Sequence, residues 1–186
     1  SSTSRGLGDV YKRQELSLAE FRTAEKLAKA LRNHGFTVTE NVGGTGIVAI
    51  LKNGEGPLVM MRADMDGLPI EEKSGLDYAS EASQLDPVTG NTFPVMHACG
   101  HDVHITSLIG TAKQMRDRMQ DWSGTLMLIG QPAEERVLGA RAMMEDDLWA
   151  RFGTPDYALA FHVSSALPAG VVNVISLLYT SDAAGE

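Results

Sequence analysis

The sequence predicts an α/β fold in which a mixed sheet is flanked by helices on both faces. Short apolar runs typical of buried strands alternate along the chain with amphipathic helical patterns. Side chains capable of acid–base or metal chemistry follow several of these runs, as they do at the ligand-binding edge of open α/β sheets. The chain shows no internal repeat and no low-complexity segment, so a single globular unit accounts for both patterns.

The first predicted element is an amphipathic helix. Ser17 and Glu20 lie three residues apart and form a capping-box pattern, which is typical of a helix N-terminus. Gly35 offers a stop beyond the last apolar position. The apolar residues of this helix are expected to be Leu18, Phe21, Ala24, Leu27, Ala28 and Leu31.

Three strands and a long loop are expected to follow this helix. The strands are predicted at residues 36–40, 46–52 and 57–62. The sequence NGEG at residues 53–56 is a turn signal, and it predicts that the second and third strands form a hairpin. Residues 66–94 are rich in turn formers, which favours a long irregular loop that is either functional or only partly ordered.

The rest of the chain alternates between helices and strands. Helices are predicted over about 101–120 and 137–152, the first with an apolar face at Ile105, Leu108, Ile109, Ala112 and Met115. A short continuous apolar strand is predicted at 124–130, and two further strands at 156–163 and 170–175. This alternation is the basis for expecting helices on both sides of one sheet.

Composition and charge exclude several classes of function. The 186 residues include 16 Lys+Arg and 24 Asp+Glu, a formal net charge of −8 that disfavours a general nucleic-acid binder. No apolar run approaches the ~20 residues of a membrane-spanning helix, so no membrane partner is expected. The single cysteine excludes an internal disulfide, and metal chemistry at a free thiol favours the cytoplasm while leaving localisation open.

The two ends of the chain look unlike the rest. The stretches 4–14 and 176–186 resemble translated adapters used in preparing sequencing libraries. We therefore expect residues 1–14 and 176–186 to be non-native and 15–175 to be part of a longer protein. The alternative interpretation is a pair of ordinary flexible termini.

Side chains able to bind metal or move protons gather where the predicted strands end. Four separate segments contribute them, and the ends of neighbouring strands meet at one edge of such a sheet. Thiolate, imidazole and carboxylate groups together suit zinc or a similar divalent cation. The candidates are Asp64, Asp66, His97, Cys99, His101, Asp102, His104, Glu134, Glu135 and His162.

Each candidate also has an ordinary structural interpretation. Cys99 alone is more simply a small buried hydrophobe. The histidines fit helix caps or core positions, and the carboxylates fit turns or favourable charges near a helix N-terminus. Only the joint arrangement favours a functional site, and His34 and His97 fit structural roles better than the others.

Four motifs occur in the order of a known family. They are MRADMDGLPIE at 61–71, HACGHDVH at 97–104, QPAEE at 131–135, and His162. Together they resemble the amidohydrolase branch of the aminoacylase/carboxypeptidase G-type metallopeptidases. That branch includes hippurate hydrolases, N-acyl-amino-acid amidohydrolases and hydrolases of indole-acetyl-amino-acid conjugates.

The resemblance implies that residues 15–175 are the N-terminal part of a zinc-peptidase-like catalytic domain. The lid domain of the family, through which the full-length protein would form a homodimer, is absent from this chain. Two departures from the family pattern are Gly67, where alanine is usual, and Ser164-Ser165, where a proline often lies nearby. A sheet lacking its later strands has an unpaired apolar edge, which predicts low solubility for residues 15–175 expressed alone.

The resemblance also implies a site for two divalent metal ions, with zinc or manganese favoured and cobalt or nickel also compatible. Cys99 would bridge the two ions, His101 and His162 would complete one, and Glu135 would bind the other. Glu134 would be the general base. The remaining implied roles are an orienting role in catalysis for Asp64 and supporting positions beside the ligands for His104 and Asp102.

The implied function is metal-dependent hydrolysis of the amide bond in N-acyl or N-aroyl amino acids, by a metal-activated water with Glu134 as base. Two alternatives stay open. In the first alternative, the chain is a truncated metal-binding half-domain without activity. The other alternative, a hydrolase with Cys99 as nucleophile and His101 as its base, leaves Glu134, Glu135 and His162 without roles.

Overall fold

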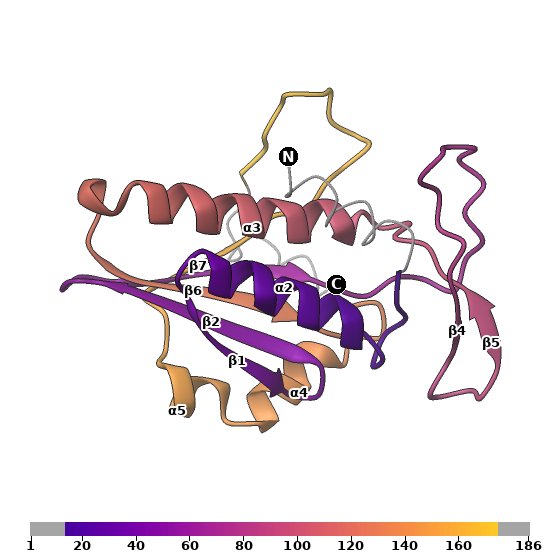
Figure 1. Cartoon of the computed structure of the whole chain (residues 1–186), viewed down its shortest axis with the longest axis horizontal. Helices are drawn as coiled ribbons and strands as arrows, with labels where there is room; N and C mark the ends of the chain where they lie inside the picture. Colours follow the sequence, from indigo (N-terminus) through magenta and orange to yellow (C-terminus); the bar gives the residue numbers. More distant parts are fainter. Residues whose placement is uncertain (1–13, 175–186) are drawn as a thin grey trace, which may run out of the picture.

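A five-stranded mixed sheet forms the centre of the structure (Figure 1). The computed structural model describes residues 14–174, and the strand order in the sheet is β1-β2-β6-β3-β7. A separate two-stranded antiparallel sheet, β4–β5, lies within the expected loop 66–94. The strands are β1 (Thr37–Val42), β2 (Gly46–Asn53), β3 (Leu58–Asp64), β4 (Ser83–Leu85), β5 (Thr92–Pro94), β6 (Gly124–Gln131) and β7 (Tyr157–Ala160).

Helices cover both faces of this sheet, which confirms the predicted fold class. Helices α2 (Phe21–Asn33) and α3 (His101–Asp117) pack on one face, and a short 3₁₀ turn, η1 (Met119–Asp121), follows α3. Helices α4 (Gly139–Glu145) and α5 (Leu148–Phe152) lie on the opposite face (Figure 1). None of the helices in the described part of the chain is long and apolar enough to cross a membrane.

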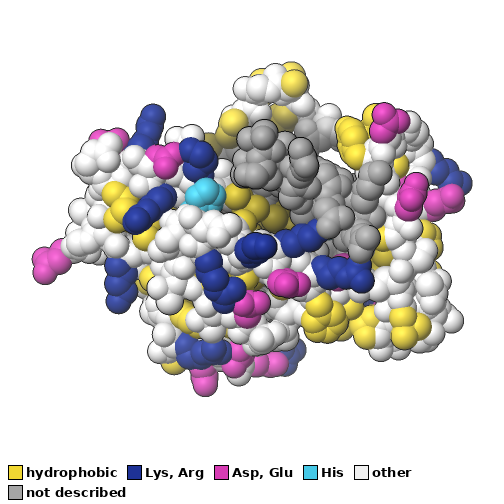
Figure 2. Space-filling view, viewed as in Figure 1, with side chains coloured by type: hydrophobic (Ala, Val, Ile, Leu, Met, Phe, Trp, Pro, Cys, Tyr) yellow, Lys and Arg dark blue, Asp and Glu magenta, His cyan; other side chains and the backbone are white. Residues whose placement is uncertain are grey.

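Each face of the sheet has its own hydrophobic core, because alternate residues of a strand point to opposite faces. In β2, Ile47 and Ala49 belong to the core under α2 and α3, whereas Val48 belongs to the core under α4 and α5. The apolar positions predicted for α3, among them Ile105 and Leu108, lie in the first core. On the α2–α3 side of the molecule, lysine and arginine side chains are interspersed with acidic ones (Figure 2).

The expected capping box at Ser17 and Glu20 does not form. Helix α2 begins at Phe21, and both side chains are buried in contacts with other parts of the chain. The helix N-terminus is instead satisfied by Glu15, whose carboxylate accepts hydrogen bonds from the backbone N–H groups of Arg22 and Thr23. Leu18 and Phe21 are consequently exposed, while the four later apolar positions are buried as predicted.

The predicted hairpin between the second and third strands is wrong. Strand β6 lies between β2 and β3, antiparallel to β2 and parallel to β3, so the loop 53–57 crosses over the start of β6. This crossing requires glycine, since a Cβ on Gly124 would lie 2.5 Å from the carbonyl oxygen of Pro57. A turn signal describes only local backbone, and the long-range pairing with β6 overrides it.

Three further expectations need correction. The helix predicted at 137–152 is two short helices, separated at Asp147 by a left-handed backbone conformation with φ of 57°. The strand predicted at 156–163 covers only Tyr157–Ala160. Residues 170–174 form no strand, and Ile175 lies outside the described residues. Apart from Gln14, the two segments expected to be adapter-derived also lie outside them.

Candidate metal centre

The candidate site lies where three parallel strands end. Strands β6 and β7 both pair in parallel with β3, and the register aligns Asp64 at the end of β3 with Gln131 at the end of β6. His162 follows the end of β7 by two residues. Helix α3 starts at His101 beside this edge, so all four segments predicted to supply ligands converge there.

His101 is the central residue of this site. Its side chain is fully buried, and its ring Nδ1 lies 2.8 Å from the backbone carbonyl oxygen of Asp66. A carbonyl oxygen can only accept, so Nδ1 carries a proton, and in the neutral ring Nε2 is the nitrogen that has a lone pair. Nε2 has no hydrogen-bond partner among the described residues and lies 3.6–3.7 Å from carboxylate oxygens of Asp64, Glu134 and Glu135.

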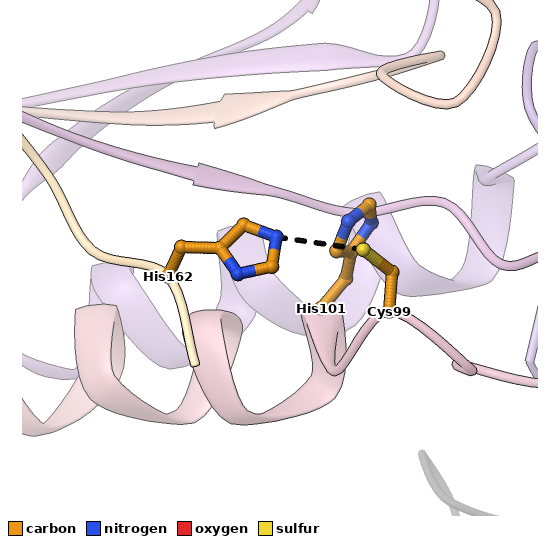
Figure 3. Close-up of side chains that lie close together, drawn as sticks. All are labelled: Cys99, His101 and His162. Carbon is orange, nitrogen blue, oxygen red and sulfur yellow. Dashed lines mark hydrogen bonds between the residues drawn. The ribbon is translucent and has the colours of Figure 1, made fainter. Parts of the chain in front are cut away.

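In the described part of the chain, three groups of potential ligands share His101. In each, the ligand atoms lie within 4.8 Å of one another. In the group shown in Figure 3, His162 points its Nε2 at the Cys99 Sγ at 3.4 Å, with the His101 ring beside them. The groups are Cys99, His101 and His162; Asp64, His101 and His104; and His101, Glu134 and Glu135.

The residues present fit a divalent cation. Buried polar side-chain atoms are normally hydrogen-bonded, yet His101 Nε2 and Glu135 Oε1 have no partner in the described structure. Both atoms are lone-pair donors, and they face each other at 3.7 Å. Carboxylate oxygens, imidazole nitrogen and a thiol in one cluster are the ligand types that zinc and related metals prefer.

His104 supports the cluster through contacts of both ring nitrogens. Its Nδ1 donates to Asp64 Oδ1 at 2.6 Å, and its Nε2 accepts from the backbone N–H of Val163 at 3.0 Å. The proton on Nδ1 and the lone pair on Nε2 are therefore both used in hydrogen bonds. The bond to Val163 fixes the backbone directly after His162. Asp64 also accepts a 2.7 Å hydrogen bond from Arg62. Although burial opposes it, the His104 hydrogen bond and the Arg62 charge hold the pKa of Asp64 below its usual range.

The sequence predicts Asp66 as a candidate site residue but indicates no role for it. In the structure, Asp66 lies at the centre of the hydrogen bonds that connect the segments of the site. Its Oδ2 accepts from the Ser17 hydroxyl at 2.5 Å and from the backbone N–H of Glu135 at 3.0 Å. Its carbonyl oxygen also contacts Nδ1 of both His97 and His101. Burial opposes ionisation, but the His101 ring, the Ser17 hydroxyl and the Glu135 N–H together lower the pKa of the Asp66 carboxyl. Its place in the same MRADMDG motif as Asp64 was the available signal.

The cluster has an excess of acidic groups. Burial, together with the charges of Glu135 and Glu134, raises the pKa of the Cys99 thiol. Burial and the charges of Asp66 and Glu134 raise the pKa of Glu135. Burial opposes protonation of His101, but the Asp66 hydrogen bond and the surrounding carboxylates raise its pKa. A bound cation would have the opposite effect and lower these pKa values, because it favours the deprotonated form of each ligand.

The remaining sequence candidates lie around this cluster. Asp102 lies in the first turn of α3, belongs to none of the three ligand groups, and acts on His97 through its charge. His97 is buried with its Nδ1 against Asp66, which fits the structural role expected for it. His34 ends α2 as its C-cap and lies outside the three ligand groups.

Fold and site together define an α/β domain of the metallopeptidase class, with thiol, imidazole and carboxylate groups converging at the ends of parallel strands. Comparison with known families agrees. The profile of peptidase family M20/M25/M40 matches residues 60–176, which is more than half of the chain. The chain belongs to this family.

Several known proteins are similar to this chain. The hippurate hydrolase of Campylobacter jejuni is 40% identical over 154 residues, covering 82% of this chain and 37% of the relative. The N-acetyl-L-cysteine deacetylase of Bacillus subtilis is 38% identical over 138 residues, covering 74% of this chain and 31% of the relative.

A solved structure shares both the fold and clear sequence identity. It is the Bacillus subtilis YXEP protein, described as a dinuclear metal-binding peptidase of the M20 family. The TM-score is 0.76 at 33% identity, and the match covers 89% of this chain and 43% of that one. This chain therefore spans less than half the length of the relatives it matches.

Proposed function

We propose that this chain carries the metal-binding and proton-transferring part of an amidohydrolase that cleaves N-acyl or N-aroyl amino acids. The observation that carries the proposal is the buried, unpartnered Nε2 of His101, surrounded by carboxylate oxygens of three residues. A positive charge at Nε2 offsets these carboxylates, and a bound metal ion would supply it while using the Nε2 lone pair.

The proposed ligands follow from the contacts of the site. Cys99, His101 and His162 form one compact group, and Glu135 extends it through the 3.7 Å approach to His101. Two divalent ions, zinc or manganese, would be held with Cys99 between them. The B. subtilis relative described as dinuclear supports this number. When bound, such ions lower the pKa of a coordinated water and polarise an amide carbonyl.

Glu134 is proposed as the general base. Its side chain is 38% exposed and that of the adjacent Glu135 is 18% exposed, although each has a carboxylate oxygen 3.7 Å from His101 Nε2. A carboxylate at the open side of the site can accept the proton of the attacking water and pass it to the departing amine nitrogen. That second transfer matters because an amine is a poor leaving group as an anion.

The substrate class rests on the relatives. Hippurate and N-acetylcysteine, named in the two relatives above, are both N-acylated amino acids. A small-molecule conjugate of this type is therefore the proposed partner of the whole protein. The acidic cluster described above is compatible with such a substrate only when cations offset its charge.

The test is hydrolysis of hippurate and N-acetyl amino acids with added zinc or manganese. Because the chain spans less than half of its relatives, two forms are assayed. One is the chain alone, and the other is a fusion in which the chain replaces the matching region of the Campylobacter hippurate hydrolase. In the fusion, Glu134→Gln is expected to lower kcat by about 10²–10⁴-fold and Cys99→Ala to abolish metal-dependent turnover. Glu25→Gln, an exposed position on α2, is the matched control. Unchanged turnover in both site variants would contradict the proposal.

The same assay decides between the alternatives. Turnover by the chain alone would exclude the inactive half-domain, whose support is that the chain spans less than half of its relatives. A cysteine nucleophile predicts activity that survives chelators and is lost on thiol alkylation. The raised pKa of Cys99 disfavours this mechanism, because the thiolate is the reactive form.

A further inference from the structure

Glu20 is a fully buried carboxylate outside the ligand cluster. It is the N-cap residue of α2, but its side chain makes no capping hydrogen bond. Glu20 is also outside the three ligand groups, and the proposed function gives it no role. One of its oxygens accepts a 2.6 Å hydrogen bond from the hydroxyl of Thr45. The other accepts a 2.7 Å hydrogen bond from the backbone N–H of Ala133. The second contact links the start of α2 to the residue directly before Glu134.

Ala133 is held from both sides in an unusual backbone conformation. It is fully buried and has a φ of 45°, in the left-handed region that residues other than glycine rarely adopt. Its carbonyl oxygen accepts hydrogen bonds from the N–H groups of Leu138 and Gly139. With its N–H on Glu20, both backbone polar groups of Ala133 are fixed, and a strained conformation persists only where its surroundings determine it.

The backbone on either side of Glu134 is anchored to a buried carboxylate. Before it, the Ala133 N–H is bound to Glu20; after it, the Glu135 N–H is bound to Asp66 at 3.0 Å. Within residues 14–174, the partly exposed Glu134 side chain has no hydrogen bond that would fix its direction, and it only approaches His101 Nε2 at 3.7 Å. Its direction is therefore set by these two backbone anchors.

We propose that Glu20 is a positioning residue for the catalytic site, acting through the Ala133 N–H to set the direction of Glu134 and the place of Glu135. This inference rests on the proposed function for its catalytic meaning, but the anchor itself can be measured without turnover. A displacement of about 1 Å at a reacting group can cost on the order of 10²-fold in rate.

The decisive variants are Glu20→Met and Glu20→Gln. Methionine fills a similar volume but offers no strong acceptor to the Ala133 N–H. Glutamine can accept from Ala133 through its amide oxygen and donate to Thr45 through its amide nitrogen. The control for general loss of stability is Leu31→Ala. Leu31 is fully buried like Glu20, but it lies on α2 in the hydrophobic core.

The first measurement is hydrogen exchange at the Ala133 amide in the metal-free chain. Glu20→Met is expected to speed this exchange, while Glu20→Gln and Leu31→Ala leave it as in wild type at a temperature where all are folded. The second is zinc affinity by chelator competition, which is expected to fall by about 10-fold in Glu20→Met alone. A third measurement uses whichever protein hydrolyses hippurate, the chain alone or the fusion. There, Glu20→Met is expected to lower kcat by a similar factor and to leave KM unchanged.

The outcomes separate this inference from the proposed function. Wild-type exchange and wild-type zinc affinity in Glu20→Met overturn the positioning role, even if the protein is an amidohydrolase. Equal losses in Glu20→Met and Leu31→Ala also overturn it, because they indicate only lost stability. If wild type binds no zinc, the proposed function fails and the exchange rates still decide the anchor. If Glu20→Met does not fold, Glu20→Asp, one methylene short, must show the same losses.

Discussion

Asp64 and Asp66 show at the scale of single residues how far a motif can be interpreted. Both were candidates from the sequence, and only Asp64 received a role. The structure gives them different partners, His104 and Arg62 for Asp64, and Ser17 and the Glu135 N–H for Asp66. Residue type and order predict which side chains reach the site. The partners come from segments far away in the sequence, so their hydrogen bonds could not be predicted from it.

Glu20 provides a residue-scale prediction about stability and pH. Burial raises its pKa above the ordinary value of 4.5, so the folded state binds this proton more tightly than the unfolded state. Stability attributable to this group is therefore lost as pH rises through the folded pKa. Glu20→Gln removes the ionisable group and is expected to make the metal-free chain more stable at pH 7 than wild type.

Urea unfolding of both proteins between pH 4 and pH 8 checks this expectation. The difference in the free energy of unfolding between Glu20→Gln and wild type should be small near pH 4. It should increase as pH rises through the folded pKa of Glu20 and then stay constant. Glu25→Gln, at an exposed position on α2, is the control for the loss of a surface carboxylate. A gap that widens toward low pH would contradict the assignment.

At the scale of elements, the sequence predicted most helices and strands but not how they pair. The periodic patterns of α2 and α3 and the apolar run of β6 depend on nearby residues, and these elements formed as expected. The capping box at Ser17 and the hairpin at residues 53–56 are also local signals, yet buried contacts with Asp66 and β6 replaced them. Tertiary contacts decide where local preferences are weak.

The turn between β1 and β2 provides a prediction at this scale. Gly43 has a φ of 63°, and a Cβ there would lie 2.4 Å from the backbone nitrogen of Met143 in α4. Neither backbone can give way easily, so Gly43→Ala is expected to destabilise by about 1–3 kcal/mol more than a change that only adds backbone strain. Gly44→Ala isolates that strain, because Gly44 also has a positive φ but nothing within 4 Å of its added Cβ. Equal urea midpoints for the two variants would refute the predicted clash.

At the scale of the whole molecule, the sheet ends in an exposed strand. Within residues 14–174, β7 pairs only with β3, and its Tyr157 and Leu159 are 64% and 60% exposed. An apolar strand with one free edge is a template for pairing with another chain. This geometry supports the expected low solubility of residues 15–175.

Leu159→Lys is expected to reduce association of the chain, because a charge on an edge strand opposes pairing with another strand. Light scattering across a concentration series measures this association. Val88→Lys is the control, since Val88 is 59% exposed but lies in the loop between β4 and β5. An equal improvement in both variants would indicate a general effect of charge and not the edge of β7.

The position of β6 between β2 and β3 has a consequence for the order of folding. A chain emerging from the ribosome presents β2, the NGEG turn and β3 some 60 residues before the start of β6. During that interval the two strands can close on each other as the local turn signal favours, and this pairing occupies the place of β6. A chain that has formed this early hairpin must open it before β6 can insert between β2 and β3. The hairpin is then a kinetic trap, because the local turn signal disagrees with the final topology.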